Sequence, residues 1–373
     1  MEQKIQNSTV IKRPSFGQRF NGYFKNKWNK IKSMTAKDWG NWFLNNAIYF
    51  VIIGFILICA FGSPGFFSID TFANVLRNMS NRVFLALGVG GIIVLTGTDL
   101  SAGRIVGFTG CFAAALFQQS DYRNKIFSFA PLTGFFGIFA AIIIVMAIGG
   151  LFGTFNGFFV AKFKLHPFIV TLATSLIIFG FSLMFAGLGK SNLISMTTEE
   201  YREAANGNIV NWFGGQFILQ TYFIFALLAV IITWFMWNYT TFGKNMYAVG
   251  ANPEAANVSG INVSKTIILV FMYAGLLYGV SGFVEGVRAG APNALLLGQG
   301  SELDAIAACV IGGVSFTGGV GKISGIVVGV LLLVLIRIGL EWLKLTTDYQ
   351  NLIKGALILF AVSVDMRKYL TKR

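Results

Sequence analysis

The uncharged stretch IFSFAPLTGFFGIFAAIIIVMAIGGLFGTFNGFFVA, residues 126–161, decides the fold. A run of about 20 apolar residues is long enough to cross a bilayer as a helix. Further charge-free runs of similar character occur at 165–189, 204–243 and 266–284. The chain of 373 residues is 55% hydrophobic and only 12% charged, whereas soluble domains average about 25% charged residues. We therefore predict an all-α polytopic membrane protein.

The net charge of +14 is concentrated at the two ends of the chain. Nine Lys and Arg residues fall in residues 1–40, and Arg367, Lys368, Lys372 and Arg373 close the sequence. Positive residues beside apolar spans stay on the cytoplasmic side, so we expect both termini to be cytoplasmic and the number of spans to be even. This placement argues against a nucleic-acid-binding groove.

Three segments follow from this pattern: a basic N-terminal extension (1–40), a membrane domain (41–366) and a basic C-terminal tail (367–373). In the extension, aromatic residues recur every four positions between Phe16 and Trp28. A helix with one aromatic face and many cations would bind an anionic lipid surface. A disordered basic tail is the alternative.

We predict about ten transmembrane helices in two weakly similar halves. They are expected near 42–62, 83–97, 103–119, 132–160, 166–188, 215–238, 265–288, 303–314, 323–342 and 350–365. Glycines at four-residue spacing, such as Gly149/Gly153 and Gly275/Gly279, predict close helix–helix contacts, since helices associate in lipid by tight packing.

Metal or disulfide chemistry is not indicated. The three cysteines lie in apolar runs without a CxxC pair, and His166 is the only histidine. The three cysteines are therefore interpreted as small buried residues. No metal and no bound cofactor are expected, and residues 1–40 do not contain the apolar core of a cleaved signal peptide.

Two of the expected spans are short and end in similar glycine-containing segments. GTDLSAGR at 97–104 aligns without gaps with GVSFTGGV at 313–320. Paired, interrupted apolar segments in corresponding places indicate a transport pathway. We therefore assign a pathway or gate to Thr98, Asp99, Ser101, Arg104, Ser315 and Thr317. Asp99 and Arg104 are expected to pair with each other or with loops of a partner subunit.

The segment TTFGKNMYAVGANPEAANVSGINVS, residues 240–264, is a polar loop between two apolar spans. Asn252 can cap a helix, Pro253 suits its first position, and Glu254 favours the positive end of its dipole. Ala255 and Ala256 are strong helix formers with slim side chains, and Gly260 suits the position after the helix. We predict a two-turn helix that docks into a groove of another protein; a solvated connection is the alternative.

These segments resemble one family. The 240–264 loop, the GTDLSAGR element, HPFIVTL at 166–172 and ELDAIAACVIGG at 302–313 are similar to the monosaccharide permeases of ATP-binding-cassette (ABC) importers, the branch that serves ribose, xylose, arabinose and galactose. The resemblance covers about 40–370. The form of GTDLSAGR is closest to that of the galactose and methyl-galactoside group. The extension 1–40 departs from the compact family pattern.

The resemblance implies a permease homodimer in the bacterial cytoplasmic membrane, a separate cytoplasmic ATPase and an extracytoplasmic sugar-binding protein. The coupling loop would contact the ATPase through Asn252, Pro253, Glu254, Ala255, Ala256 and Gly260. This chain is then a transporter subunit and no enzyme: Gly321-Lys322 is followed by Ile323, and Phe316 stands where a phosphate-binding loop needs its first glycine. ATP would be used by the partner subunit.

Several alternatives remain open at this point. The substrate could be another monosaccharide (ribose or xylose) or a nucleoside. A secondary transporter would need more intramembrane carboxylates than Asp99, and a membrane enzyme would need a cluster of His, Asp and Glu.

We interpret the pairs Glu285/Arg288 and Arg337/Glu341 as structural, and Glu302 and Asp304 as helix-dipole partners or as part of an outer surface. The segment 191–214 could dock a binding protein or simply cover the bundle. Because specificity would reside in the binding protein, we expect no tight sugar site.

Overall fold

The structure is a computed structural model. It describes residues 33, 35, 38–39, 47–63, 65–212, 217–346, 348–349, 351–353, 355–356, 359 and 363. The chain divides into two units, residues 1–50 and 51–373. Most of the predicted extension 1–40, including its aromatic face, and the whole tail 367–373 lie outside the described residues.

The second unit is built from helices and one small sheet. The helices are α3 (Ala47–Gly62, which begins in the first unit), α4 (Ile69–Val94), α5 (Ala102–Leu116), α6 (Gly134–Lys162), α7 (Pro167–Leu188), α8 (Glu199–Asn206), α9 (Tyr222–Tyr239), α10 (Thr241–Ala251), α11 (Pro253–Val258), α12 (Val263–Ala289), α13 (Ser301–Ile311) and α14 (Ile323–Trp342).

Five helices in the described part of the chain are long and apolar enough to cross a membrane: α6, α7, α9, α12 and α14. Residues 53–62 and helix α5 are shorter apolar helices. This supports the polytopic all-α class. The prediction of ten spans stays a prediction, because its last span, 350–365, is described only in part.

Helix α4 corrects one predicted boundary. The sequence placed a short span at 83–97, but α4 begins at Ile69, where the Ser68 hydroxyl accepts a hydrogen bond from the amide of Thr71. The first half of α4 carries Asn74, Asn78 and Arg82. These polar residues interrupt the run of apolar residues by which a membrane helix is predicted from sequence. Their side chains find polar partners on α4 itself and on other helices, so the polar half continues the helix.

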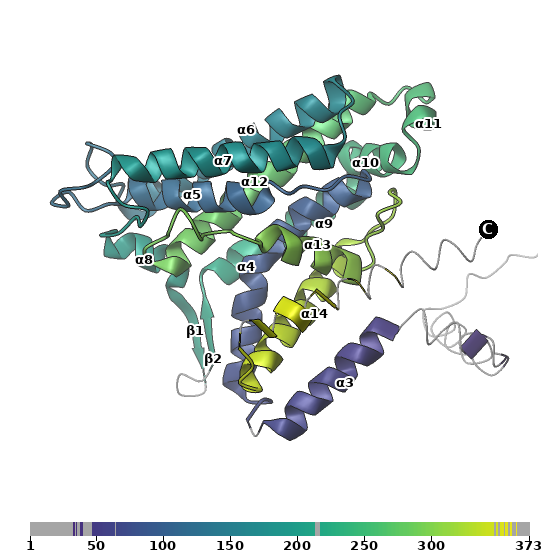
Figure 1. The fold of residues 1–373 in the computed structure, drawn as a ribbon, viewed down its shortest axis with the longest axis horizontal. Helices are drawn as coiled ribbons and strands as arrows, with labels where there is room; N and C mark the ends of the chain where they lie inside the picture. Colours follow the sequence, from purple (N-terminus) through teal and green to yellow (C-terminus); the bar gives the residue numbers. More distant parts are fainter. Residues whose placement is uncertain are drawn as a thin grey trace, which may run out of the picture. The chain divides into compact units, whose positions relative to one another are not determined.

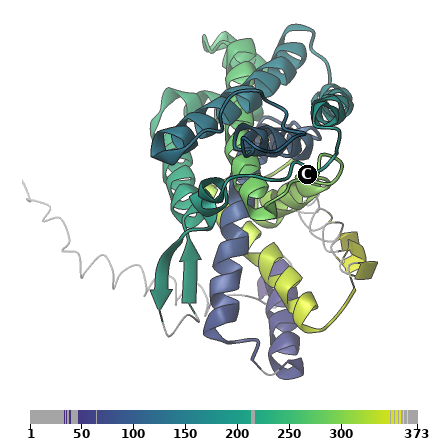
Figure 2. The same cartoon turned by 90° about the vertical axis from the view of Figure 1, so that its left-hand side faces the viewer.

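A second correction concerns the span predicted at 215–238. Strand β1 (Asn208–Trp212) pairs in antiparallel fashion with β2 (Phe217–Gln220), and α9 begins only at Tyr222. The backbone groups of residues 217–220 are therefore used by a hairpin instead of a helix. Strand β2 packs against α4, and Figure 2 shows the hairpin beside that helix.

Helices α6 and α12 form the most extensive helix pair, and their contact runs along glycines whose four-residue spacing predicted close helix packing without naming the partner helix. A Cβ atom added at Gly149 would lie 2.2 Å from the carbonyl oxygen of Gly275. No side chain fits at such a distance, so the two backbones touch directly. In Figure 1 the two helices run side by side, with α11 near one end of α12 and α8 near the other.

Candidate coupling and translocation site

The 240–264 segment is mostly helical, which corrects its interpretation as one polar loop. Helix α10 continues from α9 after Thr240 and ends at Ala251, and the short helix α11 follows at once. The turn from α9 into α10 is tight, because a Cβ atom at Gly243 would lie 2.1 Å from the carbonyl oxygen of Trp237. Helix α10 thus holds α11 at a fixed place.

The predicted local structure of α11 is confirmed. The Asn252 side chain accepts a hydrogen bond from the amide of Ala255 at 3.0 Å, and Pro253 occupies the first turn. At the other end, Gly260 has φ +84°. Its amide donates to the carbonyl of Asn257, and the amide of Ile261 donates to that of Ala256, both at 3.0 Å. This is a Schellman end, in which a glycine closes the helix.

One face of α11 is presented to the surroundings. Ala256 is 4% exposed and anchors the helix, whereas Glu254 is exposed and Val258 is 90% exposed. Residues four apart lie on the same helical face, so Glu254 and Val258 form a protruding acidic and apolar edge. Val258 is not among the residues predicted from the sequence, although its spacing from Glu254 is a signal that could have identified it.

A junction joins α10 to the ends of both interrupted elements. The amide of Gly319 donates to the carbonyl of Val94, the last residue of α4, at 2.9 Å. The Tyr247 hydroxyl of α10 donates to the carbonyl of Gly321, also at 2.9 Å. A Cβ atom at Gly250 would lie 1.9 Å from the Val94 oxygen. We call Val94, Tyr247, Gly250, Gly319 and Gly321 the coupling junction.

The first interrupted element, after α4, is held by buried polar contacts. Asp99 is 1% exposed, and its carboxylate accepts hydrogen bonds from the amide and hydroxyl of Ser101 at 2.9 and 2.6 Å. The Ser101 hydroxyl accepts another from Asn156 of α6 at 2.8 Å. The amide of Leu100 donates to Thr171 of α7. Asp99 therefore clasps this loop within the bundle.

Arg104 lies elsewhere and does not pair with Asp99 in this structure. Its guanidinium donates to the carbonyl of Leu295 at 3.2 Å and lies 4.2 Å from the centre of the Phe179 ring. The predicted Asp99–Arg104 pair is thus wrong within one chain. The reason is that α5 begins at Ala102 and turns the two side chains toward different neighbours.

The second interrupted element, after α13, has a related local structure. The amide of Thr317 donates to the Ser315 hydroxyl at 3.3 Å, as Ser101 does to Asp99 in the first element. Both preceding helices end in a Schellman motif, but the left-handed residue is Thr96 in one and Gly313 in the other. The ungapped alignment thus pairs the Asp99–Ser101 turn with the Ser315–Thr317 turn. The left-handed residue that ends the preceding helix comes one alignment position earlier in the first element than in the second. Ser315 is buried and Thr317 is exposed.

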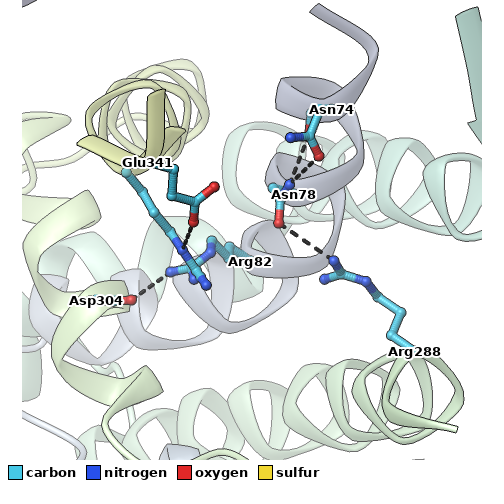
Figure 3. Close-up of polar contacts among 7 residues, drawn as sticks. Asn74, Asn78, Arg82, Arg288, Asp304 and Glu341 are labelled. Carbon is cyan, nitrogen blue, oxygen red and sulfur yellow. Dashed lines mark hydrogen bonds and ion pairs between the residues drawn. The ribbon is translucent and has the colours of Figure 1, made fainter. Parts of the chain in front are cut away.

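The structure also contains a polar cavity that the sequence analysis did not assemble. Its charged lining residues are Arg82 of α4, Glu285 of α12, Asp304 of α13, and Arg337 and Glu341 of α14. Arg82 and Asp304 form an ion pair at 2.5 Å, and Arg337 pairs with Glu341 at 3.2 Å. Figure 3 shows Arg82 directed toward Asp304 and Arg288 directed toward Asn78. The predicted Glu285–Arg288 pair is replaced by separate partners, since Glu285 accepts from Asn81.

The segment 191–214 contains the predicted short helix, α8. Tyr201 is fully buried, stacks on Phe117 with ring centres 4.9 Å apart, and meets the edge of Phe283. One face of α8 therefore covers the bundle. Glu199 and Arg202 remain exposed on it.

Comparison with known proteins places these features in a class of transport proteins. Residues 71–362 match the family described as "Branched-chain amino acid transport system / permease component". The chain belongs to this permease family.

Several relatives have more specific names. The galactose/methyl galactoside import permease MglC of Salmonella typhimurium is 39% identical over 343 residues, which is 92% of this chain and 100% of the relative. MglC of Escherichia coli K12 gives the same identity and coverage. The ribose import permease RbsC of that organism is 32% identical over 329 residues, 88% of this chain and 95% of the relative. No solved structure gives a significant match.

Family membership and the five long apolar helices make this chain a multi-pass protein of the cytoplasmic membrane. Within the described residues, no group of His, Cys, Asp and Glu is placed to hold a metal ion.

Proposed function

We propose that this chain is the membrane subunit of an ABC importer that moves galactose or methyl galactoside into a bacterial cell. The observation that carries the proposal is α11, a capped and exposed helix fixed to a rigid bundle. The sugar comes from the names of the MglC relatives, which are more similar to this chain than RbsC is. Ribose or another monosaccharide is the alternative substrate.

In this proposal α11 docks into a cleft of a separate ATPase. Pro253, Glu254 and Val258 would contact the ATPase, while Asn252 and Gly260 hold the two ends of the helix. The exposed Ala255 keeps the outward side of the helix thin enough to enter a cleft, and the buried Ala256 holds the helix against the bundle. ATP is bound and hydrolysed by that subunit, and this chain needs no cofactor of its own.

The coupling junction transmits the movement. Because Val94 ends α4 and Gly319 follows α13, a displacement of α10 acts directly on both interrupted elements. Thr98, Asp99, Ser101, Ser315 and Thr317 lie within these two elements. We propose that the elements form an inner gate, with Asp99 as a clasp. Arg104 is then a packing residue that holds α5 against α7 and the 291–300 segment.

The complete importer would hold two copies of this chain, which together enclose the pathway, and a sugar-binding protein on the outer face. Both termini would be cytoplasmic, and the basic extension 1–40 would lie on lipid headgroups. The 41–366 membrane domain carries the transport activity.

Uptake of radiolabelled galactose by proteoliposomes tests the proposal. The liposomes contain the full chain, its ATPase and its binding protein, and Glu254→Lys is compared with Asp121→Lys. The first variant should reduce ATP-dependent uptake about tenfold, because an exposed docking contact is reversed in charge; the second, in the exposed loop between α5 and α6, should not. Uptake that needs no ATP in the wild type would overturn the ABC assignment. Equal uptake by both variants would remove Glu254 from the ATPase contact.

A further inference from the structure

The polar cavity lies at the end of α12 that is remote from α11. Helix α12 starts at Val263, four residues after the α11 end cap at Ser259, and its last turns carry Glu285 and Ala289, which line the cavity. A helix of this length measures roughly 40 Å. If α11 faces the cytoplasm, the cavity opens toward the outer face of the membrane.

The cavity has room for a small polar ligand. Its volume is about 1030 Å³, and it reaches from α4 and α13 to the segment between α12 and α13. Two cations, Arg82 and Arg337, stand against three carboxylates, Glu285, Asp304 and Glu341. Nearly balanced charges disfavour an ionic ligand, while they offer many hydrogen-bond donors and acceptors to an uncharged one.

A second observation lies at the inner end of the cavity. A smaller pocket of about 40 Å³ shares Arg82, Glu285, Ser301 and Asp304 with it and is also lined by Asn81. Asn81 is 3% exposed; its amide nitrogen donates to Glu285, while its side-chain oxygen has no hydrogen-bond partner. A buried polar atom without a partner is costly, and a ligand hydroxyl entering the small pocket would satisfy it.

We propose that this cavity is a binding site for a neutral monosaccharide on its way from the outer face to the gate. Asn81, Glu285 and Asp304 accept hydrogen bonds from sugar hydroxyls, and Arg82 donates to a sugar oxygen while it stays paired with Asp304. The proposal rests on the function proposed above and assigns a substrate site to named residues.

The residues that line the cavity also predict weak binding of the sugar. The described residues around the cavity and the small pocket include no aromatic side chain on which a sugar ring could stack. Hydrogen bonds alone hold the ligand, each contributing little after desolvation. A weak site suits a transit position, because the sugar must also leave it.

The test measures sugar binding directly, without the binding protein. Saturation-transfer NMR of D-galactose is recorded on the full chain with its ATPase in lipid nanodiscs, and L-leucine serves as the control ligand. We expect galactose to bind with a dissociation constant on the order of 1 mM and leucine not to bind. Glu285→Gln should weaken galactose binding about tenfold, since it removes a charged acceptor, and Glu199→Gln on α8 should leave it unchanged.

A second variant separates a loss of the binding site from a loss of folding. Ala289→Leu introduces aliphatic bulk at an exposed position of the cavity wall and should weaken galactose binding without removing a polar contact or adding an aromatic surface. Absence of saturable galactose binding in the wild type, or equal binding by the wild type and Ala289→Leu, would overturn the site. ATP-dependent uptake by the same preparation decides whether the importer assignment stands when the site fails.

Discussion

At the scale of single residues, Tyr247 links the helix that carries α11 to the loop after α13. Its hydroxyl donates to the carbonyl of Gly321, and its ring meets the edge of Trp237 with centres 5.8 Å apart. Burial raises the pKa of Tyr247 to about 12. The phenol therefore stays protonated near neutral pH, and its hydrogen bond is lost only when the pH rises through that value.

Replacing Tyr247 by Phe should uncouple transport from ATP hydrolysis. The change removes one hydrogen bond, worth about 1 kcal/mol, between α10 and the loop after α13 that we propose as part of the gate. We expect the sugar transported per ATP hydrolysed to fall several-fold, measured as uptake and phosphate release in the same proteoliposomes.

Tyr273→Phe is the matched control. The Tyr273 hydroxyl shares a hydrogen bond of 2.7 Å with Thr233, on the α9–α12 side of the bundle and outside the junction. It should lower thermal stability by a similar amount and leave the transport ratio unchanged. Equal ratios in the two variants would show that the Tyr247 bond only stabilises the fold.

At the scale of elements, local signals predicted α11 but not α4. The signals for α11 act over a few residues: Asn252 caps the helix, Pro253 follows it and Gly260 closes the helix. Such local signals can be recognised in the sequence alone. Helix α4 also has a local start signal in Ser68, but its polar first half depends on partners of Arg82 and Asn78 that come from α13 and α12. Such partners, more than 200 positions away in sequence, leave no periodic pattern.

Gly260→Ala should fray the end of α11. A side chain in the left-handed conformation costs about 1 kcal/mol, and φ is +84° here. We expect faster hydrogen exchange at the amides of residues 254–259 and reduced ATPase binding. Gly180→Ala in α7 is the control, because a Cβ atom there meets nothing within 4 Å. Unchanged exchange in Gly260→Ala would mean that another residue closes the helix.

At the scale of the whole molecule, α11 and the polar cavity should lie on opposite sides of the membrane. Val258→Cys on α11 and Leu296→Cys beside the cavity provide the test, since both positions are exposed. The three native cysteines are buried and should stay silent. A membrane-impermeant maleimide should label Leu296→Cys from outside and Val258→Cys only from the cytoplasmic side. Labelling of both from one side would contradict this topology.

The cavity shows why the candidate site was only half predictable. The pathway residues proposed from GTDLSAGR and GVSFTGGV are contiguous in sequence, so the motifs could suggest them without a structure, and their assignment stays a prediction. Arg82, Glu285, Asp304 and Glu341 lie on four different helices and meet only after packing. Each looked like an ordinary surface or helix-end charge when considered alone.

The backbone contact between Gly149 and Gly275 has one further mechanical consequence. Gly275 lies near the middle of α12, whose two ends are close to α11 and to the cavity. A rigid helix that tilts about its midpoint moves its two ends in opposite directions. If α12 tilts about the Gly149–Gly275 contact, a displacement of the end near α11 moves the end that lines the cavity in the opposite direction. The same tilt would then narrow the pathway on one side of the membrane and widen it on the other.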